Sequence, residues 1–236
     1  MRGVLAASTD ARLLDVTHEF PRGDIRTAAF WLREILPYFP PAVHLVVVDP
    51  GVGTDRRVLV VQAGDHALVG PDNGVLWPAA EALSDAPSPF ALTAFEAESD
   101  TFHGRDVFAP LAADVHDRHA GGVEHMADLS PIDDPVEYRL PVADVTEDCA
   151  IGEVIVIDGF GNVITNIPGA FVENHIGGSL EVDGTDYPVA KSYAHVTRGQ
   201  PLVTIGSHGN VELAANDARG ARIFDLGVGD RVRLDR

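Results

Sequence analysis

Cysteine and lysine are nearly absent from this 236-residue chain, which contains one of each, Cys149 and Lys191. A lone cysteine excludes an intrachain disulfide and a metal site built from several thiolates, and nothing requires an oxidising compartment. The apolar runs are much shorter than the roughly 20 residues that span a bilayer, and no charged segment precedes an apolar signal core. We therefore expect a cytoplasmic protein without a membrane segment.

Positive charge is also scarce, because 17 basic residues stand against 36 acidic ones and the formal net charge is -19. Such an excess argues against a nucleic-acid backbone or an anionic membrane as partner. Few lysines and many carboxylates keep a protein hydrated in concentrated salt, where ions screen the self-repulsion of the negative charge. We interpret the composition as that of an acidic, halophilic protein, and not as evidence of its activity.

Hydrophobic patterning divides the chain into two parts. In residues 1–135, strands with nearly continuous apolar residues alternate with helical patterns. Strands that are covered on both faces have this composition, so we predict an α/β domain with a mainly parallel sheet. The expected strands include residues 43–49 and 57–63, and the expected helices are 25–39, 71–83 and 104–118.

The second part begins after a segment that is rich in proline and acidic residues. This segment, residues 136–149, has no clear period and is predicted to be a linker. Residues 150–236 contain short strand patterns separated by turn signals, among them an Asp-Gly hairpin turn at 183–184. We predict a small all-β domain there, a barrel or a sandwich.

The stretch "HLVVVDPGVGTDRR" puts an acid and an arginine at the two ends of a glycine-rich loop. Asp49 ends an apolar strand and Arg56 follows it by seven residues. Ligands of open α/β sheets usually bind where strands end in this way. Asp, Pro and Gly also form plain turns, and the spacing alone favours a turn. The glycine spacing is neither that of a phosphate loop nor that of a dinucleotide site.

Three further stretches contain polar residues at suggestive positions. His103 precedes a glycine at a helix entrance, where it is either a neighbour of the helix cap or a site residue. In "IDGFGNVITNI", residues 157–167, the Gly-Asn pair could simply turn a hairpin, and the pattern alone favours that interpretation. In "GSHGNVELAAN", residues 206–216, polar side chains lie on a strand edge with no obvious structural need.

A histidine-rich stretch invites comparison with a metal site. His116, His119 and His125 lie close together in the sequence, but no carboxylates accompany them at ligand spacing. We expect a solvated helix end there and assign no metal ion.

Five motifs, taken in order, resemble those of the S-adenosylmethionine hydroxide adenosyltransferases, relatives of the bacterial fluorinase and chlorinase. They are "VVVDPGVGTDRR", "GPDNGVLWPAA", "TFHGRDVFAP", "IDGFGNVITNI" and "GSHGNVELAAN". The resemblance covers essentially the whole chain. It implies an amino-terminal α/β domain and a smaller carboxy-terminal β domain, assembled as a homotrimer with active sites at subunit interfaces.

The reaction implied by the resemblance is hydrolysis of the small molecule S-adenosylmethionine to adenosine and methionine, with no cofactor. Asp49, Arg56 and His103 match the set that positions and activates the attacking water. A sulfonium is a good leaving group, so the chemical need is a base for water, and the sequence leaves Asp49 and His103 as alternatives. The matching substrate-binding candidates are Phe102, Asp158, Phe160, Asn162, Tyr193, Ser207, Glu212 and Asn216.

The resemblance also suggests how these candidates act. The aromatic residues would stack on adenine, Asp158 would meet the methionine ammonium, and Ser207 and its neighbours would reach the carboxylate or the adenine edge.

Two positions favour water over halide as the nucleophile. Asp49 stands where the fluorinase pattern has tyrosine, and Gly104 stands where it has a halide-binding serine. A halide-using 5′-adenosyl transferase, similar to the chlorinase, is the nearest alternative. The family's ribose-gripping aspartate, in a Thr-Asp-Phe-Gly strand end, has no counterpart in these 236 residues. A non-catalytic protein that binds adenosine or S-adenosylmethionine is therefore the alternative from a different class.

Overall fold

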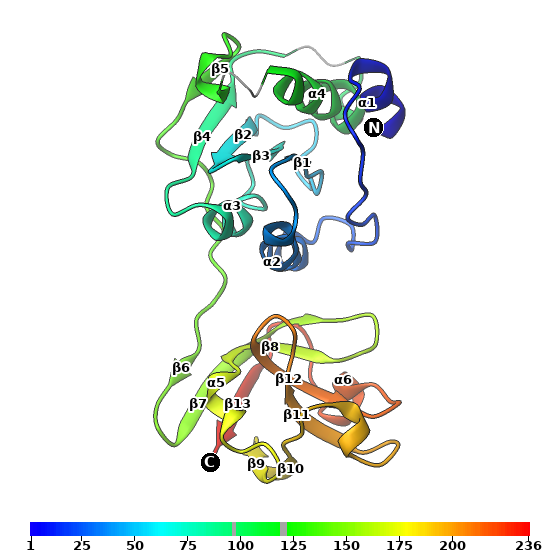
Figure 1. Ribbon diagram of the computed structural model, residues 1–236, viewed down its shortest axis with the longest axis vertical. Coiled ribbons are helices and arrows are strands. Elements are labelled where there is room, and N and C mark those ends of the chain that lie inside the picture. Colours follow the sequence, from blue (N-terminus) through cyan, green and yellow to red (C-terminus); the bar gives the residue numbers. More distant parts are fainter. Residues whose placement is uncertain (96–97, 119–121) are drawn as a thin grey trace. The chain divides into compact units, whose positions relative to one another are not determined.

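The computed structural model describes residues 1–95, 98–118 and 122–236. The chain divides into two compact units, Met1–Leu140 and Pro141–Arg236 (Figure 1). Across the described residues, every helix is too short or too polar to serve as a membrane span.

The amino-terminal unit is built on a five-stranded sheet with the strand order β1-β3-β2-β4-β5. Its strands are β1 (Val43–Leu45), β2 (Val58–Ala63), β3 (His66–Pro71), β4 (Ser88–Leu92) and β5 (Leu129–Pro131). β1 and β3 are parallel, whereas β2 pairs antiparallel with β3 and β4, and β4 with β5. The mainly parallel pairing predicted from the sequence is therefore wrong, although the α/β class is confirmed.

The reason for the antiparallel pairing is local. Only two residues, Gly64 and Asp65, separate β2 from β3, and so short a connection can only fold the second strand back along the first. The continuous apolar composition of β2 reports that both of its faces are covered. It carries no information on the direction of the neighbouring strands.

Helices cover both faces of this sheet (Figure 1). On one face, Leu59 and Val61 of β2 pack in a buried cluster with α2 (Ile25–Ile35) and α3 (Trp77–Leu83). On the other face, Val58 and Val60 pack with Phe108 and with α4 (Ala109–Arg118). The short helix α1 (Arg2–Ser8) lies beside α4.

The three predicted helices are present, with ends set by local hydrogen bonds. Asp24 caps α2 by accepting from the Thr27 amide at 2.9 Å, and a 3₁₀ turn, η1 (Leu36–Tyr38), follows that helix. α3 begins only at Trp77, because Asn73 first makes a turn in which its side chain accepts from the Val75 amide at 3.1 Å. A π-helical turn, η2 (Gly104–Phe108), precedes α4.

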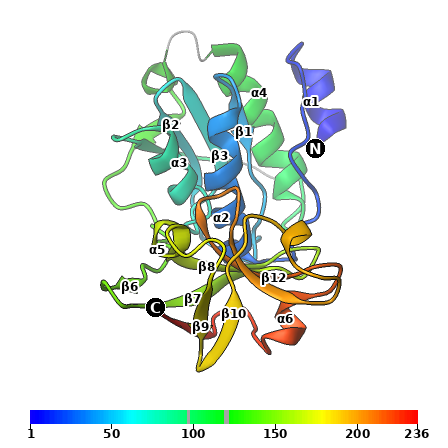
Figure 2. The ribbon, with the colours of Figure 1, turned by 60° about the horizontal axis from the view of Figure 1, so that its bottom comes forward.

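The carboxy-terminal unit consists of eight strands, all paired antiparallel. The order is β10-β9-β13-β7-β8-β12-β11, with β6 paired to β7. Figure 2 shows β7, β8 and β12 side by side. The strands are β6 (Asp144–Val145), β7 (Cys149–Ile157), β8 (Val163–Pro168), β9 (Ser179–Val182), β10 (Thr185–Pro188), β11 (Pro201–Ile205), β12 (Asn210–Ala215) and β13 (Arg231–Asp235).

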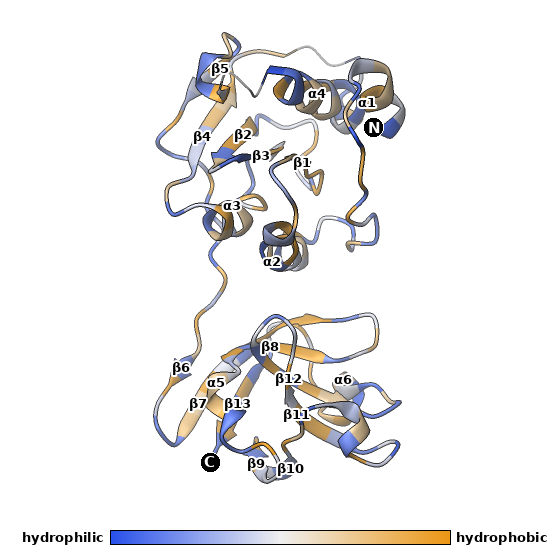
Figure 3. Ribbon diagram, viewed as in Figure 1, coloured by the Kyte–Doolittle hydropathy of each residue, from blue (hydrophilic) through white to orange (hydrophobic). Residues whose placement is uncertain are grey.

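A bridge between Val189 and Val203 joins the two ends of this strand order, so the sheet is nearly closed into a barrel. The predicted all-β character is confirmed, and the expected hairpin turn has positive φ at both Asp183 and Gly184. Its strands are mainly hydrophobic and the loops between them more polar (Figure 3). Two short helices, α5 (Ala170–Glu173) and α6 (Gly220–Ile223), complete the unit. The segment predicted as a linker contains β6.

Candidate active site

A buried ion pair joins Asp49 and Arg56 in the amino-terminal unit. Arg56 Nη2 donates to Asp49 Oδ2 at 2.6 Å, and Nε lies 3.0 Å from the same oxygen and 3.2 Å from Oδ1. The two side chains are only 5% and 8% exposed. The guanidinium also lies over the Phe108 ring, 5.0 Å from its centroid. Burial makes this pair a fixed element of the site, unlike an exposed salt bridge.

The loop between the two residues is shaped by its own glycines and threonine. Thr54 ties it to the Gly51 carbonyl by its amide at 3.1 Å and by its hydroxyl at 2.7 Å. Gly53 has φ +81° and would place a Cβ 3.0 Å from the Asp100 carbonyl oxygen. A side chain there would be strained and would push away the segment that leads to His103. The loop is thus a turn, and it also holds two site residues together.

His103 completes the arrangement from 47 residues further along the chain. Arg56 Nη2 lies 2.8 Å from His103 Nδ1, and the imidazole is only 6% exposed. A guanidinium nitrogen carries hydrogens and no acceptor, so Nδ1 must be the acceptor and the proton of the neutral ring must lie on Nε2. The structure therefore brings Asp49, Arg56 and His103 together around one guanidinium, as the resemblance implies.

Phe102 lies next to His103 and is 57% exposed. The Arg105 guanidinium lies over its ring at 5.0 Å from the centroid. An exposed aromatic ring with a cation on one face leaves the other face available for stacking.

A second group of predicted residues is connected within the carboxy-terminal unit. Asp158 directly follows β7 and accepts hydrogen bonds from the amides of Phe160 and Asn162 at 2.9 and 2.8 Å. Asn162 Nδ2 donates to Asp158 Oδ2 at 2.9 Å and to Tyr193 Oη at 3.2 Å. The turn between the two strands therefore places the Asp158 carboxylate beside the Asn162 amide, instead of merely reversing the chain.

Tyr193 belongs to a 3₁₀ turn, η5 (Tyr193–His195), and its hydroxyl donates to Glu212 Oε1 at 2.5 Å. Burial raises the pKa of Tyr193, and the hydrogen bond to Glu212 raises it further. Glu212 is a buried carboxylate on β12, just after the pairing of that strand with β8 shifts register. Such irregularities often redirect a side chain next to a functional site.

The side chains of three other predicted residues form no hydrogen bond with this network among those described. Phe160 is 81% exposed at the tip of its turn, and Ser207 is also exposed. Asn216 donates from Nδ2 to the Val196 carbonyl at 2.9 Å, which secures the segment after η5.

His208 is a residue that the sequence interpretation missed. Its side chain is 4% exposed, and Nε2 lies 3.8 Å from Glu212 Oε2. Nδ1 accepts from the Asn210 amide at 3.2 Å. A Cβ on Gly206 would lie 2.3 Å from His208 Nε2, so this glycine leaves the space that the ring occupies. The signal was present in the two glycines that flank "SH" in the fifth motif.

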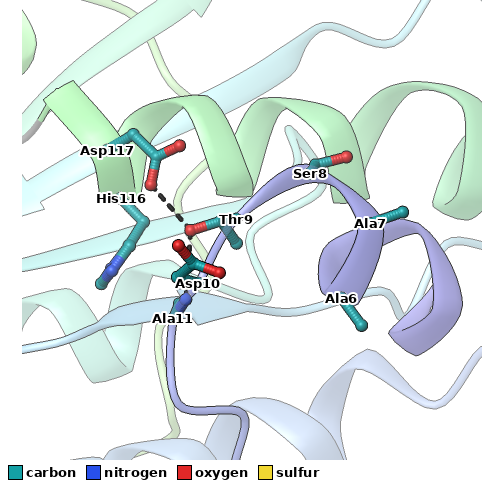
Figure 4. Close-up of a pocket in the computed structure, with 8 residues that line it drawn as sticks. All are labelled: Ala6, Ala7, Ser8, Thr9, Asp10, Ala11, His116 and Asp117. Carbon is teal, nitrogen blue, oxygen red and sulfur yellow. Dashed lines mark hydrogen bonds between the residues drawn. The ribbon is translucent and has the colours of Figure 1, made fainter.

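A pocket of about 410 Å³ lies elsewhere, between the end of α1 and the last turns of α4 (Figure 4). Thr9 donates to Asp117 across it at 2.7 Å, and His116 also lines it. No predicted site residue is among the residues that line it. In the described part of the chain, no three histidine, cysteine or carboxylate side chains cluster as metal ligands would. His119 lies outside the described residues.

Comparison with known proteins places these motifs in one family. Residues 1–124 match the model of the SAM hydroxide adenosyltransferase N-terminal domain, and residues 152–233 match that of the C-terminal domain. The chain belongs to the SAM hydroxide adenosyltransferase family. Two curated relatives named "(R)-S-adenosyl-L-methionine hydrolase" are each 41% identical to it. The match to the protein from Salinispora tropica spans 98% of this chain and 90% of the relative's length. The match to the protein from Thermus thermophilus spans 94% of this chain and 87% of the relative's length.

Two solved structures have the same fold as this chain. An uncharacterized conserved protein from Thermotoga maritima has a TM-score of 0.85 and 32% identity, over 100% of this chain and 93% of its own. A conserved hypothetical protein from Thermus thermophilus has a TM-score of 0.75 and 37% identity, over 99% and 91%. The resemblance read from the five motifs is therefore confirmed.

Proposed function

We propose that this adenosyltransferase family member hydrolyses S-adenosyl-L-methionine to adenosine and L-methionine by attack of water on the 5′ carbon. The observation that carries the proposal is the buried Asp49–Arg56–His103 arrangement. The relatives named as (R)-S-adenosyl-L-methionine hydrolases support the same reaction. As the oxygen of water bonds to the 5′ carbon, the bond from that carbon to sulfur breaks, and methionine leaves as a neutral thioether.

Water is the weak partner in this displacement, so it must lose a proton as it attacks. We assign the base to Asp49. Nδ1 of His103 already takes a hydrogen from Arg56, and Nε2 of the neutral ring already carries one, so His103 has no lone pair to offer. The Asp49 carboxylate keeps further lone pairs beyond those that Arg56 uses.

Arg56 and His103 then have orienting roles. Arg56 keeps the Asp49 carboxylate in one position through charge-assisted hydrogen bonds. The His103 Nε2–H group would donate to the oxygen of the attacking water. Arg56 Nη1 is buried without a hydrogen-bond partner among the described residues, which makes it a further donor for water or for a substrate oxygen.

Gly104 supports water over halide as the nucleophile. The position offers no hydroxyl to a halide ion, and a Cβ there would lie 3.3 Å from a Val47 methyl carbon. A serine in its place would therefore be crowded. For the assembled protein we propose a homotrimer with active sites at subunit interfaces, as the family resemblance implies.

The test is to incubate the protein with S-adenosylmethionine in oxygen-18 water and to analyse the adenosine by mass spectrometry. Label in the 5′-hydroxyl is expected. Unlabelled adenosine would contradict direct displacement by water. A 5′-chlorinated adenosine formed in the presence of chloride would favour the halide alternative, and adenosine binding without turnover would favour the non-catalytic one.

A further inference from the structure

Glu212 has the geometry of a residue that acts on its neighbours and not on the substrate directly. Its side chain is buried, one carboxylate oxygen accepts a hydrogen bond from the Tyr193 hydroxyl at 2.5 Å, and the other lies 3.8 Å from His208 Nε2. The first contact is a short charge-assisted hydrogen bond. The second contact is longer than a hydrogen bond, so His208 acts on Glu212 through packing and through the dipole of its Nε2–H group.

The direction of this bond decides what Tyr193 can offer to a ligand. A phenol hydroxyl has one hydrogen to donate, and a carboxylate can only accept. The Tyr193 hydroxyl therefore uses its hydrogen in the bond to Glu212. Tyr193 Oη in turn accepts from Asn162 Nδ2 at 3.2 Å. Toward any further partner, Tyr193 can therefore act only as an acceptor.

The same reasoning extends to Asn162 and Asp158. One hydrogen of Asn162 Nδ2 is donated to Asp158 and the other to Tyr193, which leaves the amide oxygen as the group that can still interact. A flipped amide would place its oxygen against the Asp158 carboxylate, so the orientation is fixed. Asp158, as a carboxylate, has only lone pairs to offer.

We propose that Glu212 is a positioning residue that holds Tyr193 as an acceptor, so that Asp158, Asn162 and Tyr193 together accept from an N–H-bearing group of the substrate. The inference rests on the proposed function for the identity of the substrate. Two groups of S-adenosylmethionine have this chemistry, the adenine amine and the methionine ammonium. A site built from paired acceptors rejects an analogue that lacks the hydrogens, because the acceptors are then left facing lone pairs or nothing.

The experiment compares affinities by titration calorimetry for two ligand pairs. Adenosine against inosine replaces the adenine amine by a carbonyl. S-Adenosylhomocysteine, which lacks the sulfonium leaving group and so is not consumed during the titration, against its desamino analogue removes the ammonium. At least one pair should differ by about tenfold or more in Kd for the unaltered protein, and the pair that differs identifies the group that is read.

Glu212→Gln should reduce that difference to about threefold or less. The His208 Nε2–H group favours the amide oxygen of the glutamine, which turns the amide NH₂ toward Tyr193 and releases the hydroxyl proton. Tyr193→Phe should reduce the difference in the same way, and it replaces Glu212→Gln in the test if Glu212→Gln does not fold. Glu181→Gln, an exposed change on β9, is the matched control and should leave the ratio unchanged.

A second measurement follows the Tyr193 hydroxyl without any ligand. The ¹³Cζ resonance of Tyr193, assigned by its loss in Tyr193→Phe, should shift in Glu212→Gln and stay in place in Glu181→Gln. Equal affinities within both ligand pairs, or an unaltered ratio in Glu212→Gln, would overturn the inference while leaving hydrolysis intact. Failure to bind either member of both pairs would instead refute the proposed function.

Discussion

The Arg56 guanidinium donates to Nδ1 of His103 at 2.8 Å, and this single contact fixes which nitrogen of the imidazole carries the proton. Any neutral tautomer with hydrogen on Nδ1 would direct an N–H group at another N–H group. The residue that is most often a base in enzymes is thereby made a donor.

The first prediction follows from this assignment. His103→Gln keeps a side-chain oxygen for Arg56 and a terminal N–H donor, so kcat should fall by about tenfold or less, whereas His103→Ala should lose about 10²-fold or more. Steady-state kinetics checks this, and ¹⁵N NMR of the free protein should show a protonated Nε2 and an unprotonated Nδ1. A glutamine variant as slow as the alanine variant would identify His103 as the base.

The second prediction concerns Asp49, the proposed base. Asp49→Asn keeps the size of the side chain but removes the charge that accepts the water proton. General-base catalysis contributes roughly 10²–10⁴-fold, so kcat should fall by about that factor while KM changes only a few-fold. Asp55→Asn, an exposed change on the same loop, is the control and should retain the parent kcat. An Asp49→Asn variant as fast as that control would leave Asp49 as a turn residue only.

Stability should depend on pH through His44, which is buried against the partly exposed His66. His44 Nε2 lies 2.9 Å from His66 Nδ1 with the rings stacked, and burial lowers the pKa of His44 from 6.5 to about 4, with the neighbouring His66 adding to the effect. The unfolded chain then binds more protons than the folded one below pH 6.5, so this contribution is present above pH 6.5 and is lost as the pH falls toward 4.

Urea unfolding at pH 7.5 and pH 5.0 measures the free energy of unfolding. The contribution of His44 should fall by about 2 kcal/mol between these two pH values, because each pH unit between the two pKa values costs about 1.36 kcal/mol. His44→Gln should remove that part of the pH dependence, and the difference between the two proteins separates it from the titration of the many carboxylates. Equal pH slopes for the parent and the variant would show that folding does not lower the pKa of His44.

Assembly provides a further prediction, which depends on the proposed trimer. If active sites form only at subunit interfaces, specific activity should fall when the protein is diluted below the concentration at which trimers persist. Light scattering at each concentration, paired with adenosine production, tests this. Full activity of a monomer identified by light scattering would contradict the proposal.

The sequence predicted the two halves of the fold well because each half has its own hydrophobic period. It failed on strand direction, since β2 is apolar on both faces whether its neighbours run parallel or antiparallel, and the two-residue turn at Gly64 and Asp65 was the decisive signal. The segment 136–149 was assigned to a linker, but its proline and acidic content did not prevent Asp144 and Val145 from pairing with β7.

For the candidate site, spacing placed Asp49 and Arg56 on one loop, but only the resemblance brought in His103, because nothing in the sequence between Arg56 and His103 reveals where the chain returns. Glu212 was predicted to bind substrate, and its burial against Tyr193 could not be seen from a strand pattern that treats every polar residue as exposed. His208 was missed for the same reason, since its contact with Glu212 depends on the space left by Gly206.

The two polar networks are each closed within one compact unit, since Asp49, Arg56 and His103 lie in Met1–Leu140 and the Tyr193–Glu212 pair lies in Pro141–Arg236. No hydrogen bond of either network has to be rebuilt when the other unit is altered. On the proposed function, an exchange of the carboxy-terminal unit for that of a relative would alter the substrate contacts around Asp158 and Tyr193 and leave the Asp49–Arg56–His103 hydrogen bonds, and the Phe102 ring beside them, as they are. Contacts in that unit could therefore change during evolution without rebuilding the groups proposed to act on water.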